Sequence, residues 1–159
     1  MKGRNKISGT SINQKLLWAS TIIFGISGIL PWFVVNFPIG NLKISILDLM
    51  IYFTSEQRVQ VDIYSTLVYV ILLVGWIFAL FFLIGTSVLQ KNKLVLVSCL
   101  ITTIPAIIWF FVIPQLQIQM IFLSLSNQPI NVNQTVGSGQ ITAMISGFIL
   151  GYSFIRMKI

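Results

Sequence analysis

Charged side chains and histidine are what this sequence has least of. Only 8% of its 159 residues are charged, and none is histidine. A soluble domain carries roughly 25% charged residues, and a disordered chain combines high charge with low hydrophobicity. With 56% hydrophobic residues, the composition excludes both classes. We expect a single integral membrane domain that covers residues 1–159.

The missing residue types also exclude several kinds of chemistry. Without histidine there is no imidazole for haem, for zinc or for general-base catalysis. Cys99 is the only cysteine, so an intramolecular disulfide and a CxxC motif are both excluded. The three acidic residues, Asp48, Glu56 and Asp62, match no calcium-loop spacing. We therefore predict a non-enzymatic protein with no catalytic residue, no cofactor and no metal.

Long uncharged apolar stretches make up most of the chain. A hydrocarbon core about 30 Å thick needs roughly 20 apolar helical residues. Four stretches meet this need, namely Leu16–Val35, Tyr64–Leu89, Leu94–Ile113 and Val136–Ile155. Only Gln90–Lys93 separates the second stretch from the third, which predicts an antiparallel helical hairpin. We predict an all-α transmembrane four-helix bundle, with the first stretch an uncleaved span rather than a secretory signal.

The basic residues divide unevenly between the two sides that these spans define. Eight of the ten lie before the first span, between the second and third, or after the fourth. The loops 36–63 and 114–135 hold the other two, Lys43 and Arg58, together with all three acids. Because basic residues accumulate on the cytoplasmic side, we expect a multi-pass cell-membrane protein with both termini in the cytoplasm. The net charge of +7 then reflects topology, and nucleic acid is not an expected partner.

The two external loops change the pattern from long apolar runs to alternation. Leu42–Ile46, Val59–Ile63 and Gln115–Met120 alternate apolar and polar residues, which is typical of half-buried strands. We expect strands near the first two of these segments, as part of a small extracellular β-sheet that caps the helices. Two alternatives stay open: both loops lie along the lipid interface, or the third helix continues to about Leu125.

Two further elements are expected in and before the first external loop. Trp32–Asn36 is suited to leave the bilayer as a strand, followed by a turn at Pro38–Asn41. Asp48–Gln57 has room for a short helix, with Leu47, Met50 and Ile51 on one face.

Four helices, cytoplasmic ends and a sheet drawn mostly from the first external loop are similar to the claudin-like architecture. The resemblance covers the whole topology and implies a helical membrane domain with an extracellular sheet. It concerns architecture alone, because the sequence has no Gly-Leu-Trp segment followed by two cysteines. It therefore implies no tight-junction or paracellular-pore role.

Small residues recur every four positions in the fourth span, at Gly139, Ala143, Gly147 and Gly151. We call this set the small-residue stripe. Small residues let helix backbones approach closely, which matters because lipid supplies no hydrophobic drive for helix association. We predict that the stripe is a helix-packing site. Its partner is either another helix of this chain, or a second copy or different subunit.

Asn133-Gln134-Thr135 is a sequon for N-glycosylation. It lies in the loop 114–135, on the side that the basic residues predict to be extracellular. Asn133 is therefore a candidate glycosylation site.

The polar residues inside the spans are all neutral, which bears on function. Their serine and threonine hydroxyls can bond back to their own helix and need no further role. The absence of an ionisable residue there weighs against a proton-coupled transporter. Our leading hypothesis is a structural or accessory subunit in the lipid bilayer. Its expected partners are other membrane protein subunits or further copies of the same chain. The alternatives are a small oligomeric channel or transporter component with a hydroxyl-lined path, and a membrane subunit of a respiratory or other enzyme complex whose partners supply the chemistry.

Overall fold

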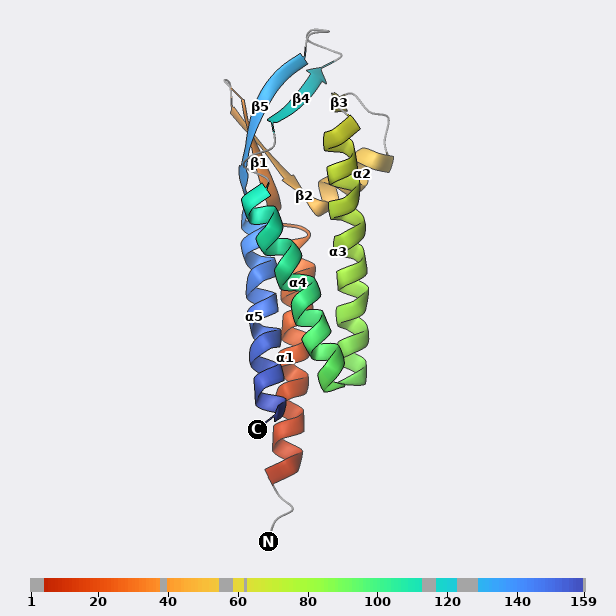
Figure 1. The fold of residues 1–159 in the computed structure, drawn as a ribbon, viewed down its shortest axis with the longest axis vertical. Coiled ribbons are helices and arrows are strands. Elements are labelled where there is room, and N and C mark those ends of the chain that lie inside the picture. The colour runs from red at the N-terminus through yellow and green to blue at the C-terminus, as the bar shows by residue number, and fades with distance from the viewer. Residues whose placement is uncertain are drawn as a thin grey trace.

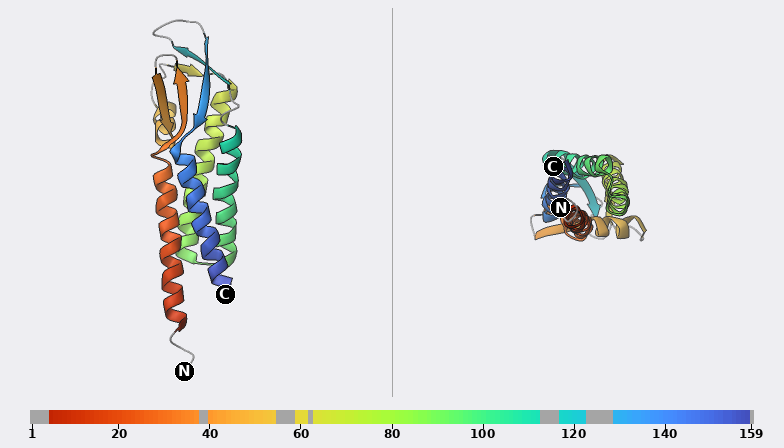
Figure 2. Two further views of the ribbon diagram at one scale, coloured as in Figure 1. Left: turned by 90° about the vertical axis from the view of Figure 1, so that its left-hand side faces the viewer. Right: turned by 90° about the horizontal axis from the view of Figure 1, so that it is seen from below.

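A computed structural model describes residues 5–37, 40–54, 59–61, 63–112, 117–122 and 129–158. Four long helices lie side by side, namely α1 (Asn5–Ser27), α3 (Ile63–Leu89), α4 (Asn92–Val112) and α5 (Ser138–Lys158) (Figure 1). A sheet and the short helix α2 (Ile46–Thr54) lie at one end of these helices. The start of α1 and the end of α5 both lie at the opposite end, together with the α3–α4 connection (Figure 2).

Three of the helices are long and apolar enough to cross a membrane, over Thr66–Leu89, Asn92–Val112 and Ser138–Met157. They coincide with the second, third and fourth spans expected from the sequence. The second and third are joined through Gln90, whose φ of 50° makes the tight reversal. The predicted antiparallel hairpin is therefore confirmed.

The expected first span, 16–35, is wrong in its last eight residues. The helix α1 ends at Ser27, and the strand β1 (Pro31–Phe37) follows after three residues. Pro31 disfavours helical geometry in the residue before it. The apolar part of α1 from Leu16 to Ser27 is about 18 Å long at 1.5 Å per residue, while the whole helix extends N-terminally through a polar segment. The expectation that Trp32–Asn36 forms a strand is confirmed.

The strands form one antiparallel sheet in the order β2-β1-β5-β4-β3. The other four strands are β2 (Gly40–Ser45), β3 (Val59–Val61), β4 (Gln117–Phe122) and β5 (Pro129–Val136). The alternating segments thus pair as strands, and the expected small sheet is present. The fold is accordingly mostly helical rather than all-α. The strand β5 was not expected, although it lies at the centre of the sheet.

The alternative of a longer third helix is wrong. The helix α4 ends at Val112, and residues 117–122 pair with β5 as the strand β4, so the third helix does not continue to Leu125. The described parts of both loops pair as strands, and their position relative to a lipid interface stays a prediction. Pairing decides the outcome because an isolated strand leaves its backbone donors and acceptors unsatisfied.

The short helix α2 begins earlier than expected because Ser45 caps it. The Ser45 amide and hydroxyl donate to Asp48 Oδ2 at 2.8 and 2.7 Å, and the Asp48 amide donates to Ser45 Oγ at 3.1 Å. This reciprocal arrangement is a capping box. Ile46 and Leu49 face the protein, whereas Leu47 and Ile51, from the face expected in the sequence, are exposed.

The helix α5 is the centre of the helical part, since its contacts with α1 and α4 are the most extensive. By contrast, α3 and α4 touch far less although they are consecutive in the chain. Figure 1 shows them meeting at their connection and separating toward the sheet. This divergence leaves space between two neighbouring helices.

Candidate functional site

The small-residue stripe lies against elements of the same chain. A Cβ atom added to Gly139 would lie 2.5 Å from Trp32 Cδ1 and 2.8 Å from the carbonyl oxygen of Ser27. One added to Gly147 would overlap the Thr103 hydroxyl and lie 3.3 Å from Thr102 Oγ1. Close approach of α5 to its neighbours therefore depends on these glycines.

The other two members of the stripe are Ala143 and Gly151. Ala143 is fully buried, and a Cβ atom on Gly151 would meet Cys99 Sγ at 3.5 Å, an ordinary contact. Cys99 itself donates to the Gly147 carbonyl oxygen at 3.4 Å. The glycines of the stripe thus face the end of α1 and the start of β1 at Gly139, and α4 at Gly147 and Gly151.

Asn133 lies in β5, in the middle of the sheet. Its backbone is in register with Asn36 of β1 on one side and with Gln117 of β4 on the other. Glycosylation at this position stays a prediction.

Hydroxyl groups join the helices in pairs. Ser20 Oγ of α1 donates to the Ser146 carbonyl of α5, and Ser146 Oγ donates to the Ser20 carbonyl, each at 3.0 Å. Thr21 and Ser87 link α1 to α3 at 2.9 Å between their hydroxyl oxygens. Thr86 and Ser98 link α3 to α4 at 2.6 Å. All of these residues are buried, so the hydroxyls act as cross-links between helices.

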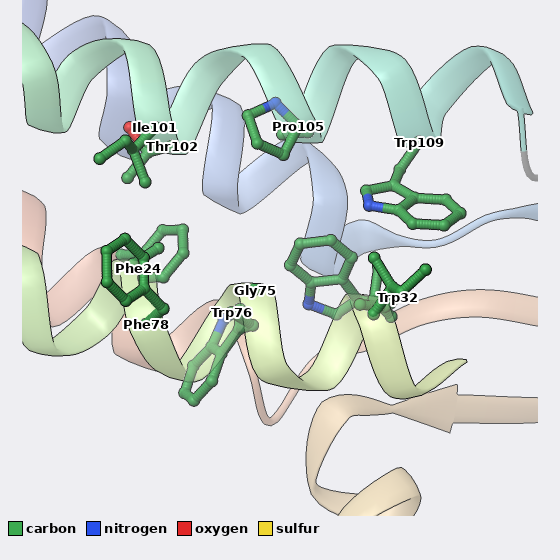
Figure 3. A pocket seen from close by; sticks show the side chains of 13 residues that line it. Phe24, Trp32, Gly75, Trp76, Phe78, Ile101, Thr102, Pro105 and Trp109 are labelled. Atoms are coloured by element: carbon green, nitrogen blue, oxygen red, sulfur yellow. The ribbon is translucent and has the colours of Figure 1, made fainter. Parts of the chain in front are cut away.

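A pocket of about 280 Å³ lies between α3 and α4. We call it the α3–α4 pocket. Figure 3 shows Pro105 and Trp109 of α4 on one side, and Gly75 and Trp76 of α3 on the other. One residue of α1 and one of β1 complete the lining, in which apolar side chains predominate. The lining residues are Phe24, Trp32, Ile71, Leu72, Gly75, Trp76, Phe78, Ala79, Ile101, Thr102, Pro105, Ala106 and Trp109.

The polar edges of two tryptophans in this lining are bonded to α1. Trp32 Nε1 donates to the Ser27 carbonyl at 2.7 Å, and Trp76 Nε1 donates to Ser27 Oγ at 3.2 Å. Trp76 also stacks on Phe24, with ring centroids 5.7 Å apart and planes 13° from parallel. Ser27 therefore holds both indoles in place and satisfies their N–H groups, so their contribution to the pocket is apolar.

Sequence reasoning missed this pocket. Trp32 is only 4% exposed and lines the pocket, and nothing in the sequence brings it together with Trp76 and Trp109. The available signal was that Gly75, which has no side chain, and Pro105, which has no N–H to donate, lie near the middle of consecutive spans.

A second polar feature lies at the junction of sheet and helices. Gln134 Nε2 donates to the Tyr69 hydroxyl at 2.6 Å, and Tyr69 stacks on Phe33 with centroids 5.1 Å apart. Gln140, at the start of α5, is fully buried, and neither its Oε1 nor its Nε2 has a partner. Buried amides without partners are costly, so Gln140 is expected to lower the stability of this junction.

No metal-binding cluster of three His, Cys, Asp or Glu residues occurs within the described residues. Comparisons with known proteins do not add a function, since no family model, no curated protein and no solved structure matches the chain. The similarity to the claudin-like architecture therefore stays a prediction.

Proposed function

We propose that the chain is a non-enzymatic membrane protein whose four long helices all cross the bilayer, and that it acts as a structural or accessory subunit. In this proposal the helices anchor the chain, and the sheet outside the bilayer contacts a partner subunit. Both termini lie in the cytoplasm. The observation that carries the proposal is the rigid joint between the helices and the sheet.

The helices and the sheet are joined by two short connections, and each leaves the sheet little freedom to move relative to the helices. Three residues connect α1 to β1, and Gly137 alone connects β5 to α5. The Gly137 amide donates to the Trp32 carbonyl at 2.9 Å, and a side chain at Gly137 would collide with the Pro31 carbonyl. The sheet therefore cannot turn relative to α1 and α5 without breaking packed contacts. A surface held this way is suited to docking, because little ordering entropy is lost on binding.

The sheet and the short helix α2 offer an apolar and partly basic surface at this end. The edge strand β2 has Leu42 48% exposed and Lys43 exposed beside it. Edge strands present unpaired backbone donors and acceptors that a partner strand can use. Leu47 and Ile51 are also exposed, on the helix α2 that directly follows β2 in the chain. These features support a contact surface beside β2.

The assignment of α1 as a fourth span rests on its outward face. Trp18, Ile22 and Ile26 are all exposed on this helix, and exposed apolar side chains in such a row are suited to lipid. The orientation rests on charge. Lys91, Lys93 and Arg156 are exposed in the α3–α4 connection, at the start of α4 and near the end of α5. These parts lie at the end opposite the sheet (Figure 1), and basic residues favour the cytoplasmic side.

The alternative of a hydroxyl-lined channel within one chain is less well supported. Its candidate hydroxyls are buried and bonded to each other across helix pairs. A conducting path needs polar groups that face water.

Affinity purification in mild detergent, with mass spectrometry of the bound chains, tests the subunit proposal. We expect a stoichiometric partner that Leu42→Lys releases, because a charge beside the free edge of β2 opposes strand addition. Thr135→Lys is the matched control, since Thr135 is exposed on the central strand β5 and should leave the partner bound. A single chain purified without any partner would contradict the proposal.

A further inference from the structure

We propose that the α3–α4 pocket binds the hydrocarbon chain of a membrane lipid. Its depth, its opening and its chemistry each support this occupant. Acyl chains and isoprenoid chains share the required chemistry. The inference requires that α3 and α4 cross the bilayer, but it does not depend on the chain being a subunit of a complex.

The pocket lies at the depth of the bilayer core. Its lining residues on α3 run from Ile71 to Ala79, and those on α4 run from Ile101 to Trp109. Both ranges lie well inside the segments that are long and apolar enough to cross a membrane, Thr66–Leu89 and Asn92–Val112. The solvent around this part of the chain is therefore hydrocarbon rather than water.

The pocket opens sideways between the two helices. Ile71 is 54% exposed and Phe78 is 59% exposed, whereas Trp32 is buried at the inner end. Gly75 lies at the opening, and a Cβ atom added there would meet nothing within 4 Å. A chain from the surrounding bilayer can enter here without first crossing a polar layer.

The local residues explain why the space between the diverging helices is not filled. Gly75 has no side chain to fill it, and Ala79 and Ala106, both buried, fill little of it. Pro105 on α4 has no N–H to donate to the carbonyl of Ile101. Small side chains therefore leave open the space between α3 and α4, which meet at their short connection and diverge toward the sheet (Figure 1).

The chemistry of the lining excludes water and charged ligands as the stable occupant. No lining residue is charged. The Thr102 hydroxyl already donates to the Ser98 carbonyl at 2.9 Å, and the indoles of Trp32 and Trp76 are bonded to Ser27. A buried water needs two to four polar partners, which this site does not provide. An empty pocket would lose dispersion contacts on every wall.

The size of the pocket favours part of a flexible chain. Sites for drug-sized ligands usually enclose about 300–1,000 Å³, and this pocket encloses about 280 Å³. Aromatic rings on both sides give a linear hydrocarbon broad apolar faces to contact. A narrow space open at one side fits a lipid tail whose head group stays outside.

Tryptophan quenching by brominated lipid tests the proposal directly. Three of the four tryptophans, Trp32, Trp76 and Trp109, line the pocket. The full chain is reconstituted in bilayers of phosphatidylcholine with brominated or unbrominated acyl chains. We expect quenching that includes the buried Trp32, because a chain inside the pocket brings bromine into contact with it. Gly75→Leu should lose that part of the quenching, since its side chain obstructs the opening.

The matched control is Gly85→Leu. Gly85 also lies on α3, and a Cβ atom there also meets nothing within 4 Å, but Gly85 does not line the pocket. Both variants exchange an unhindered helical glycine for leucine, so both should fold. Gly85→Leu should be quenched like the original chain. Equal quenching of all three proteins would overturn the proposal.

Two further measurements make the result specific. A polyprenol added to the brominated bilayer should protect the tryptophans if the pocket prefers an isoprenoid chain, and should have no effect if acyl chains occupy it. Native mass spectrometry should show less retained lipid on Gly75→Leu than on Gly85→Leu. If Gly75→Leu instead dissociates an oligomer and leaves lipid retention unchanged, the pocket receives a protein side chain, and the proposal is wrong. None of these outcomes depends on the purification of a partner subunit.

Discussion

Glycines on different helices of this protein have opposite environments. Gly139 and Gly147 of α5 face atoms that leave no room for a side chain, whereas Gly75 and Gly85 of α3 face open space. The residue type is the same, and each lies in an apolar helical segment. What differs is the distance to the neighbouring helix. The effect of substitution is therefore set by position rather than by residue type.

Gly147→Leu should destabilise the protein. Its side chain would have to displace Thr103 and Thr102 of α4, and overpacking of this kind costs about 1–3 kcal/mol. In lipid no hydrophobic gain offsets the lost packing between α4 and α5. The measurement is the temperature at which the protein loses its monodisperse size-exclusion peak in detergent.

Gly85→Leu is the control for Gly147→Leu. It makes the same exchange in a helix with no neighbouring atom in reach, and it should be neutral or stabilising by up to about 1 kcal/mol because leucine is the better helix former. A Gly147→Leu protein as stable as Gly85→Leu would show that α5 does not depend on close approach at Gly147.

At the scale of elements, polar cross-links supplement packing. Apolar side chains gain little by leaving lipid for another helix, so interhelical hydrogen bonds and close van der Waals contact become important. Hydroxyl pairs join α1 to α5, α1 to α3 and α3 to α4. The α1–α5 pair is reciprocal, since each serine donates to the other's backbone. The helix α5 thus has both the tightest packing and the most symmetric cross-link.

Ser20→Ala and Ser146→Ala should each destabilise the protein, and their effects should not add. The hydrogen bonds between the two serines form one unit. The first substitution already disrupts most of this unit, so the second removes little further stabilisation. Measured interhelical hydrogen bonds suggest a coupling of about 0.6 kcal/mol and at most about 1.7 kcal/mol. A double-mutant cycle based on unfolding in detergent measures it.

Thr142→Ala provides the control pair with Ser20→Ala. Thr142 Oγ1 donates only within its own helix, to the Ser138 carbonyl at 2.9 Å, so its coupling to Ser20 should be close to zero. Strict additivity of the Ser20 and Ser146 substitutions would mean that the reciprocal pair does not join the two helices.

At the scale of the whole molecule, charge and secondary structure separate along the long axis. Of the described basic residues, Lys91, Lys93 and Arg156 lie in the α3–α4 connection, at the start of α4 and near the end of α5, whereas Lys43 lies in β2 of the sheet. The α3–α4 connection and the end of α5 lie at one end of the molecule and the sheet at the other (Figure 1). An apolar helical section about as long as a bilayer is thick lies between the two ends. This separation supports a fixed orientation in the membrane.

Cysteine labelling in intact cells should show this orientation. In a Cys99→Ser background, single cysteines at Asn5 and Lys91 should resist an impermeant thiol reagent, and one at Asn131 should react. Asn5 begins α1, Lys91 lies in the α3–α4 connection, and Asn131 lies in β5. The physical reason is the basic excess at the end with the termini, which favours retention in the cytoplasm.

Labelling of permeabilised cells is the control, because all three cysteines should then react. Reaction at Asn5 in intact cells, without reaction at Asn131, would reverse the orientation. It would also move the sheet and its β2 edge to the cytoplasmic side, where partners of a different compartment would be available.

The sequence by itself determined the features that depend on local pattern. Hydropathy placed α3, α4 and α5, because crossing a bilayer demands about 20 apolar residues whatever the neighbours are. The four residues Gln90–Lys93 between the second and third apolar stretches required a hairpin. Alternation of apolar and polar residues placed strands near β2, β3 and β4, although burial in β2 itself does not alternate but increases along the strand toward Ser45. These requirements act over a few residues and are visible without the fold.

The tertiary structure decided the features that depend on neighbours distant in the chain. The end of α1 at Ser27 and the strand β5 are set by pairing between β1 and β5, whose residues lie about a hundred positions apart. The partners of the stripe are set by the approach of α4 and α1 to α5. The α3–α4 pocket exists because two consecutive helices diverge, and helix crossing is fixed by the fit of side chains between helices. No local pattern encodes that fit, since it depends on which surfaces meet.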